Sequence, residues 1–210
     1  MGILAATDTP LRPKNNYSGQ RLFRLKEQLN SCAWGAFMAM AGATRRMLVN
    51  SDRIEKKIFL KAPRERVWRA ISDPSHYGAW FGVQIDGPFV AGKEAIGRIV
   101  PTQADAEVAR LKEPYRGMPW HIVVDRLEPI TLFSFRWHPY AIDPNRDYSK
   151  EPMTLVTFEL ADAEGGTLLT VTESGFDQIP ADRRTKAIEA NNGGWAHQTR
   201  LIEKYLHLRA

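Results

Sequence analysis

Cysteine is almost absent from this sequence of 210 residues, because Cys32 is the only one. A lone cysteine excludes an intrachain disulfide framework, and it leaves no zinc site built on several cysteines. This composition suits a reducing compartment, so we predict a cytoplasmic protein.

A membrane-spanning run is also missing. The apolar stretch CAWGAFMAMAGA at residues 32–43 has 12 residues, whereas a spanning helix needs about 20. Basic residues ahead of it resemble a secretory signal with a small-residue cleavage site at residues 41–43, but Glu27 interrupts a basic region that is unusually long. A second hypothesis is that translation starts at Met47 and that the upstream residues come from an extended gene model.

Motifs of metal binding and catalysis are lacking as well. The five histidines show no HxH, HExxH or histidine-with-cysteine spacing. Ser174 is not flanked by the glycines of GxSxG, and residues 87–94 do not complete GxxxxGK[ST], because Glu94 stands at the last position. We therefore predict no metal and no other cofactor, and we assign no catalytic residue. Whether the protein is an enzyme stays open, with a non-enzyme favoured.

Excess positive charge is confined to the N-terminal quarter. The net charge of the chain is +5, of which residues 1–52 carry +4 and residues 53–210 carry +1. A nearly neutral body is a poor binder of phosphate backbones, so we predict no nucleic-acid partner. Because residues 7–20 contain proline, asparagine and glycine without an apolar period, we divide the chain into a flexible or partly helical extension (1–52) and one folded domain (53–210).

The domain opens with residues of alternating polarity and then turns helical. The alternation at residues 53–62 predicts a half-exposed strand. Helical spacing at residues 63–72 predicts a helix that Asp73-Pro74 ends, and residues 75–81 fit a second short helix. Two more strands are expected near 83–85 and 94–100.

The second half predicts a meander and a terminal helix. Residues 101–118 read as an insertion with a helical turn at 106–111, and a helical pattern runs from Pro180 to the end, interrupted at residues 191–194 by two asparagines and two glycines. Strands that alternate and are separated by turns make an antiparallel sheet, so we predict an α+β fold in one domain. The four strands of this meander are expected at 120–128, 131–138, 153–161 and 167–175.

Four blocks of the chain resemble a known family. RIEKKIFLKAPRERVWRAISDPSHYGAWFG, LEPITLFSFRW, GGTLLTVTESGFD and GGWAHQTRLIEKYL occur in order between residues 53 and 207. They resemble the domains of the activator of heat-shock protein 90 ATPase, in the START-like, helix-grip (SRPBCC) superfamily, which includes many bacterial proteins. The resemblance implies two short helices after the first strand and about seven strands wrapped around a long C-terminal helix, with a cavity between them. Residues 101–118 and 139–152 look longer than in a minimal member.

Strand parity and the helical stripe together predict a set of ligand-binding residues. Apolar side chains that share one face of each strand, together with the buried stripe of the last helix, can line a pocket. The alternative is that they fill a solid core. The set is Trp80, Ile122, Val124, Phe133, Phe135, Trp137, Val156, Phe158, Val171, Glu173, Trp195, Thr199 and Ile202.

Glu173 is the member of this set with the most specific functional interpretation. If it faces inward beside Val171, it is a carboxylate among aromatic rings, and desolvation raises its pKa. It then orients a polar ligand or acts as an acid or base; the alternatives are a hydrogen bond from Arg, Trp or Tyr, or exposure at the strand end. His76 and Tyr77 are expected at the mouth of the pocket, and His197 is expected to be exposed.

Three functions compete. The first is binding of a hydrophobic or aromatic small molecule between sheet and terminal helix by a monomer or homodimer. The second, implied by the resemblance alone, is an interaction domain with a heat-shock protein 90 partner, although residues 1–52 are too short to supply the activator's separate N-terminal domain. The third is a cyclase or dehydratase that uses Glu173 in a tryptophan-lined pocket.

Overall fold

The structure, a computed structural model, describes residues 52–143 and 145–209. The secretory-like segment and the alternative start therefore lie outside the described residues. The helices and strands that the sequence predicts are present, and their ends move by no more than about two residues. In chain order the elements are β1 (Arg53–Leu60), α2 (Arg64–Ser72), α3 (Pro74–Phe81), β2 (Val83–Ile85), β3 (Glu94–Ile99), α4 (Ala106–Lys112), η1 (Glu113–Tyr115), β4 (Pro119–Glu128), β5 (Leu132–Trp137), β6 (Thr154–Ala163), β7 (Gly166–Ser174), η2 (Phe176–Gln178) and α5 (Ala181–Leu208).

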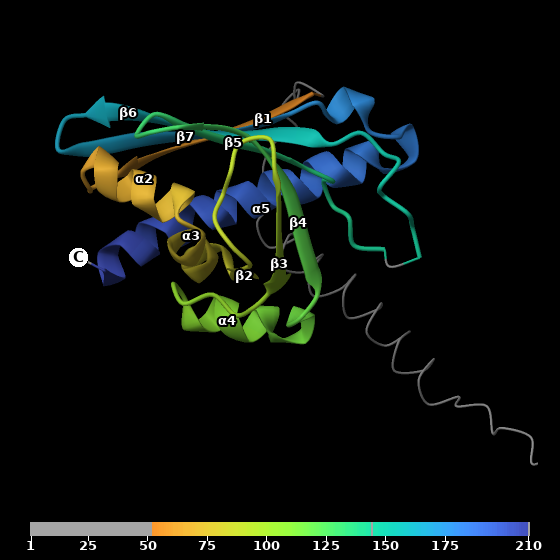
Figure 1. Ribbon diagram of the computed structural model, residues 1–210, viewed down its shortest axis with the longest axis horizontal. Coiled ribbons are helices and arrows are strands. Elements are labelled where there is room, and N and C mark those ends of the chain that lie inside the picture. The colour runs from red at the N-terminus through yellow and green to blue at the C-terminus, as the bar shows by residue number, and fades with distance from the viewer. Residues whose placement is uncertain (1–51, 144, 210) are drawn as a thin grey trace, which may run out of the picture. The chain divides into compact units, whose positions relative to one another are not determined.

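The strands form one sheet of seven in the order β1-β7-β6-β5-β4-β3-β2, and every neighbouring pair is antiparallel. The first two strands of the chain thus lie at opposite edges. The helices α2 and α3 connect them across one face, and α5 lies along the same face, around which the sheet curves (Figure 1). This is the helix-grip arrangement that the resemblance implies, so the predicted fold is confirmed.

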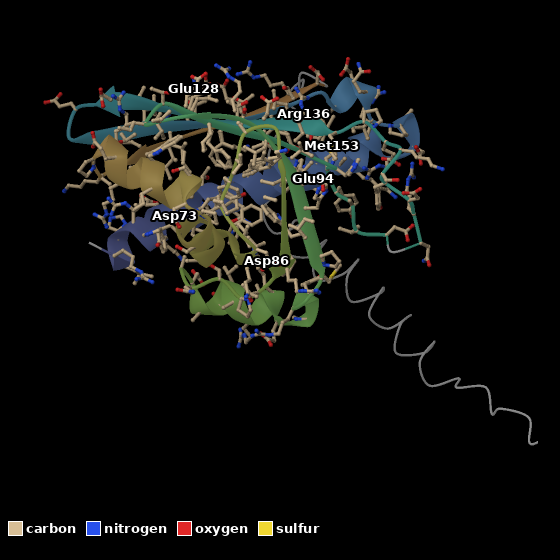
Figure 2. The ribbon with its side chains drawn as sticks, viewed as in Figure 1. Asp73, Asp86, Glu94, Glu128, Arg136 and Met153 are labelled. Atoms are coloured by element: carbon tan, nitrogen blue, oxygen red, sulfur yellow. The ribbon has the colours of Figure 1, made fainter. Side chains whose placement is uncertain are left out.

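The alternation of the strands decides which side chains enter the core. On β1, Ile54 and Leu60 are buried while Arg53, Glu55 and Lys57 are exposed, as the pattern predicts. Figure 2 shows the consequence for the whole sheet: nitrogen and oxygen tips line its outer side, and carbon fills the space toward α5.

Ser134 departs from this alternation. It is placed by parity on the outer face of β5, yet it is buried. A β-bulge between Val124 and Arg126 brings the Arg126 N–H to 3.1 Å from the Ser134 hydroxyl oxygen, and that hydroxyl donates to Asp125 Oδ2 at 2.9 Å. The bulge bends β4, as an extra residue in one strand does.

Asp73 separates the two short helices. Its backbone is extended, so α2 ends there, and its Oδ1 accepts from the backbone N–H groups of Ser75 (2.8 Å) and His76 (3.2 Å). Pro74 occupies the first turn of α3, where its missing N–H costs nothing. Asp73 lies at this junction in Figure 2. The sequence Ser-Asp-Pro therefore starts the second helix as well as ending the first.

The carbonyl groups of residues 78–81, at the C-terminal end of α3, all have donors. The Gly82 N–H donates to the Gly78 carbonyl oxygen at 2.9 Å, and the Gln103 N–H donates to the Ala79 carbonyl oxygen at 2.7 Å. The Thr102 hydroxyl lies 2.8 Å from the Trp80 carbonyl oxygen, and the Lys112 ammonium donates to the Phe81 carbonyl oxygen. The inserted segment that carries α4 thus satisfies three of the groups that a helix end leaves open.

Lys112 makes the stability of the protein depend on pH. Burial lowers the pKa of its amine from 10.5 to about 8. Between these pH values the unfolded chain binds more protons than the native state, so the native state gains stability as the pH rises. We expect the unfolding free energy of the wild type, relative to Lys112→Met, to rise by at most about 3 kcal/mol from pH 8 to 10.5. Urea unfolding of both proteins measures this, and a difference that falls with pH would contradict it.

The last helix, α5, has 28 residues and runs without a break through residues 191–194, where the sequence pattern is interrupted. The predicted stripe faces the core: Trp195, Thr199, Ile202 and Leu206 are buried. Among the described residues, no helix is long and apolar enough to cross a membrane.

Arg183 holds the long loop between β5 and β6 against α5. Its Nε donates to Glu151 Oε2 at 2.7 Å, and Nη2 and Nη1 donate to the carbonyl oxygens of Pro139 (2.8 Å) and Tyr140 (3.1 Å). The guanidinium also lies over the Tyr148 ring, 4.8 Å from its centroid. A buried arginine with all these partners anchors a polar loop that has no regular structure of its own.

Candidate functional site

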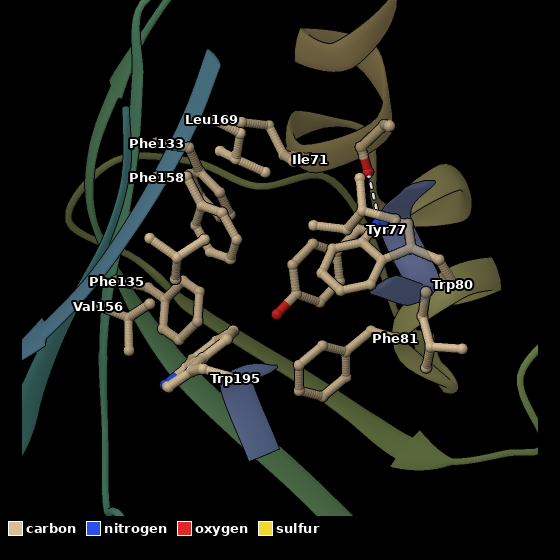
Figure 3. Close-up of a cluster of buried hydrophobic side chains, with 14 of the residues drawn as sticks. Ile71, Tyr77, Trp80, Phe81, Phe133, Phe135, Val156, Phe158, Leu169 and Trp195 are labelled. Carbon is tan, nitrogen blue, oxygen red and sulfur yellow. Dashed lines mark hydrogen bonds between the residues drawn. The ribbon is translucent and has the colours of Figure 1, made fainter. Parts of the chain in front are cut away.

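The structure brings the predicted ligand-binding residues together on the concave side of the sheet, facing α3 and α5. All of them are buried except Trp137, which is half-buried. Figure 3 shows Phe133, Phe135, Val156 and Phe158 on the sheet side, opposite Trp80 from α3. Their contact with a ligand stays a prediction.

Tyr77 lies at the centre of this aromatic cluster and not at its mouth, where the sequence analysis placed it. Its side chain is fully buried, and six rings lie with centroids 4.8–6.5 Å from its own. Every residue from Tyr77 to Phe81 is buried, because α3 packs against β2, α2 and α5. Residues 77–81 contain no charged side chain over more than one full turn of the helix, and this is the signal that was available. The six rings belong to Trp80, Phe81, Phe89, Trp120, Phe133 and Phe135.

Two polar groups in the cluster have no hydrogen-bond partner among the described residues: the Tyr77 hydroxyl and the Trp120 Nε1. Trp120 is 6% exposed and Tyr77 is 0% exposed. By contrast, Trp80 Nε1 donates to the Ala70 carbonyl oxygen at 2.8 Å, the dashed line in Figure 3. Figure 3 shows the Tyr77 hydroxyl directed away from Trp80, toward the side of the cluster where Phe135 and Trp195 lie. Desolvation raises the pKa of Tyr77 well above its usual value, so the hydroxyl keeps its proton.

Glu173 is fully buried at the other end of the cluster and connects the sheet to α5. Trp137 Nε1 and the Thr154 hydroxyl donate to its Oε1 at 2.7 and 2.6 Å. Trp195 Nε1 donates to Oε2 at 2.6 Å, and the Asn191 amide lies 2.9 and 3.0 Å from the two oxygens. The alternative in which a tryptophan is the hydrogen-bond partner of Glu173 is therefore the one found, with two tryptophans.

Two effects oppose each other at this carboxylate. Desolvation is the larger and raises the pKa of Glu173, while the hydrogen bonds from Thr154, Trp137, Trp195 and Asn191 lower it. The two indole N–H groups and the amide nitrogen of Asn191 can only donate, which favours the ionised form. Both oxygens are occupied, so little acceptor capacity remains for a proton transfer to a bound molecule. The arrangement orients the indole rings of Trp137 and Trp195, whose centroids are 5.6 Å apart.

The histidines lie outside this cluster. His76 Nδ1 is 2.7 Å from the Tyr205 hydroxyl and joins α3 to α5. His197, which the sequence placed in solvent, is half-buried, and desolvation lowers its pKa. Within residues 52–143 and 145–209, no three His, Cys, Asp or Glu side chains are grouped closely enough to hold a metal ion.

An open groove of about 580 Å³ lies elsewhere, on the outer side of α3. Its lining comes from α3, β2 and the turn that follows β2, and includes Pro74, Gly78, Val83 and Pro88. None of the predicted ligand-binding residues lines it.

Comparison with known proteins shows which family has this architecture. The model of the family described as Activator of Hsp90 ATPase homolog 1-like protein matches residues 61–207. Among curated proteins no match is found.

Several solved structures share the fold. DynU16, from the dynemicin biosynthetic locus, is 22% identical with a TM-score of 0.52; the match covers 74% of this chain and 47% of DynU16, so the chain spans less than half of that protein. MLL2253 from Mesorhizobium loti is 22% identical with a TM-score of 0.54, covering 75% of this chain and 98% of the other. The Aha1 dimer from Colwellia psychrerythraea is 18% identical with a TM-score of 0.50, covering 72% and 92%. At these identities the likeness extends to the fold alone. The family match covers well over half of the chain, and the protein therefore belongs to the family of activator of Hsp90 ATPase homolog 1-like proteins.

Proposed function

We propose that residues 53–210 form a domain that binds a hydrophobic or aromatic small molecule between the sheet and α5 and performs no chemistry on it. Residues 1–52 are then an extension to this domain, and the protein acts in the cytoplasm as a monomer or homodimer. The contact surface is the aromatic cluster around Tyr77 together with the inner face of β4 to β7.

The Tyr77 hydroxyl is the observation that carries this proposal. It is fully buried among rings that offer it no acceptor, and it has no partner in the described part of the chain. Leaving a buried hydroxyl unpaired costs about 1–3 kcal/mol, and most such groups in proteins are paired. A bound molecule with a polar atom at this point removes that cost, whereas a purely structural core is better served by phenylalanine.

The proposal that the domain does not catalyse a reaction of its ligand depends on the hydrogen bonds of Glu173. It is the only carboxylate buried within the described part of the sheet–helix interface, and its oxygens are already occupied by four donors. General acid–base catalysis requires a group within hydrogen-bond reach of the reacting proton. A carboxylate that is saturated by fixed partners serves to position the two indoles instead.

Tyr77→Phe tests the proposal. Without ligand, the variant is expected to be about 1 kcal/mol more stable than the wild type, because it keeps the ring and loses the unpaired hydroxyl. The matched control is Tyr205→Phe, which loses the 2.7 Å bond to His76 and is expected to be less stable. Urea unfolding measures both.

Ligand binding is then measured as a rise in Tm with a panel of uncharged one-ring and two-ring aromatic compounds. The wild type and Tyr205→Phe are expected to gain Tm by mass action, and Tyr77→Phe is expected to gain less. If no compound raises the Tm of the wild type, the protein is not a binder of this class.

A further inference from the structure

The two unpartnered groups in the aromatic cluster restrict the chemistry of a bound molecule. The rings of Tyr77 and Trp120 are neighbours in this cluster, with centroids 6.0 Å apart. The indole Nε1 can only donate a hydrogen bond, and the Tyr77 hydroxyl donates unless it meets another donor. The nearest side chains are the hydrocarbon rings of Phe81, Phe89 and Phe133, which accept nothing of comparable strength. A molecule that satisfies this region must bring an acceptor.

The charge of that molecule is restricted by Glu173. Trp137 and Trp195, which donate to this carboxylate, belong to the same cluster, with centroids 5.7 Å from those of Phe135 and Phe158. In residues 52–143 and 145–209, no lysine or arginine forms an ion pair with Glu173. An anion placed in this low-dielectric space loses its hydration and finds no ion-paired cation at Glu173 to compensate that loss.

We propose that the bound molecule is an uncharged aromatic carbonyl compound, a ketone or a quinone, whose oxygen accepts hydrogen bonds from Tyr77 and Trp120. This inference rests on the proposed function and adds the ligand class to it. An ionised carboxylic acid of the same shape offers an acceptor but carries a charge that loses its hydration on burial. A hydrocarbon of the same shape fits the rings but leaves both donors unpaired.

Three one-ring probes of nearly equal size separate these possibilities: acetophenone, α-methylstyrene and benzoate. α-Methylstyrene replaces the carbonyl oxygen with a CH₂ group, and benzoate replaces the methyl group with a charged oxygen. Dissociation constants for the full chain come from NMR titrations. Acetophenone is expected to bind about tenfold more tightly than α-methylstyrene, because a site with unpaired donors discriminates against an analogue that lacks the acceptor. Benzoate is expected to bind most weakly.

Tyr77→Phe and Trp120→Phe assign this preference to the two donors. Each is expected to lower the ratio of the acetophenone and α-methylstyrene affinities, a ratio that is unaffected by a uniform loss of binding. Tyr205→Phe is expected to leave the ratio unchanged.

The outcomes are distinct. Equal affinities for acetophenone and α-methylstyrene overturn the carbonyl inference and leave the proposed function standing. Benzoate as the tightest binder overturns the requirement for an uncharged ligand. If the wild type binds none of the three probes and no compound of the aromatic panel, the inference and the proposed function both fall.

Discussion

Glu173→Ala is expected to lower the free energy of unfolding by about 3–5 kcal/mol, because it leaves several buried donors unpaired at about 1–3 kcal/mol each, while the carboxylate's own desolvation cost disappears and offsets part of this loss. The substitution leaves four donors without their acceptor: two indole N–H groups, the Asn191 amide and the Thr154 hydroxyl. Each unpaired buried donor carries its own desolvation cost. The change also removes the hydrogen bonds that link β5, β6 and β7 to α5 through Glu173, because these donors come from the helix and from the neighbouring strands.

Two further variants define the cause of this loss. Glu159→Ala removes an exposed glutamate from the outer side of β6 and is expected to change stability by less than about 0.5 kcal/mol. Glu173→Gln keeps the shape and one acceptor oxygen, so its loss is expected to be smaller than that of alanine. Urea unfolding followed by tryptophan fluorescence reports both stability and the surroundings of the indoles. A loss below about 1 kcal/mol for Glu173→Ala would show that the network contributes little.

Gly78→Ala is expected to destabilise the protein by about 2–3 kcal/mol, although alanine is normally favoured over glycine inside a helix by about 1 kcal/mol. A Cβ on Gly78 would lie 2.2 Å from the carbonyl oxygen of Val83. That oxygen belongs to the backbone of β2 and cannot rotate away, so α3 would have to move off the edge of the sheet. Because α3 carries Tyr77 and Trp80, such a movement also disturbs the aromatic cluster.

Gly87→Ala is the control for this effect. Gly87 has a φ of 87° and open space around the position of a Cβ, so alanine there costs only backbone strain. Gly78 has an ordinary helical conformation, yet its substitution is expected to cost more. Thermal and urea unfolding compare the two. A stabilising effect of Gly78→Ala would mean that α3 does not pack this closely against β2.

Much of the fold follows from local patterns. Alternating residues predicted the strands, and the apolar spacing of α5 predicted its buried stripe despite the two glycines within it. The insertion was recognised as a short helix from residues 106–111. These predictions succeed because side chains repeat every two residues in a strand and every 3.6 residues in a helix, whatever the element packs against.

The candidate site was predicted only in part. Parity assigned Phe133, Phe135 and Glu173 to the inner face, where the structure has them. Tyr77 was placed at the mouth of the pocket from its position just after the first helix, whose end Asp73-Pro74 fixes. Its burial depends on the cover supplied by Phe89 and Trp120, which are 12 and 43 positions further along the chain. No local pattern contains that contact.

The sequence by itself determined the order and type of the elements, the α+β class and the inward face of β1 and of β4 to β7, because these depend on neighbours within a few residues. It also carried the family resemblance. Only the tertiary structure decided which polar groups find partners: Glu173 receives donors from β5, β6 and α5, and Tyr77 and Trp120 receive none among the described residues. The physical reason is that a hydrogen bond requires two groups within about 3 Å, and that distance is set by how the sheet curves around α5.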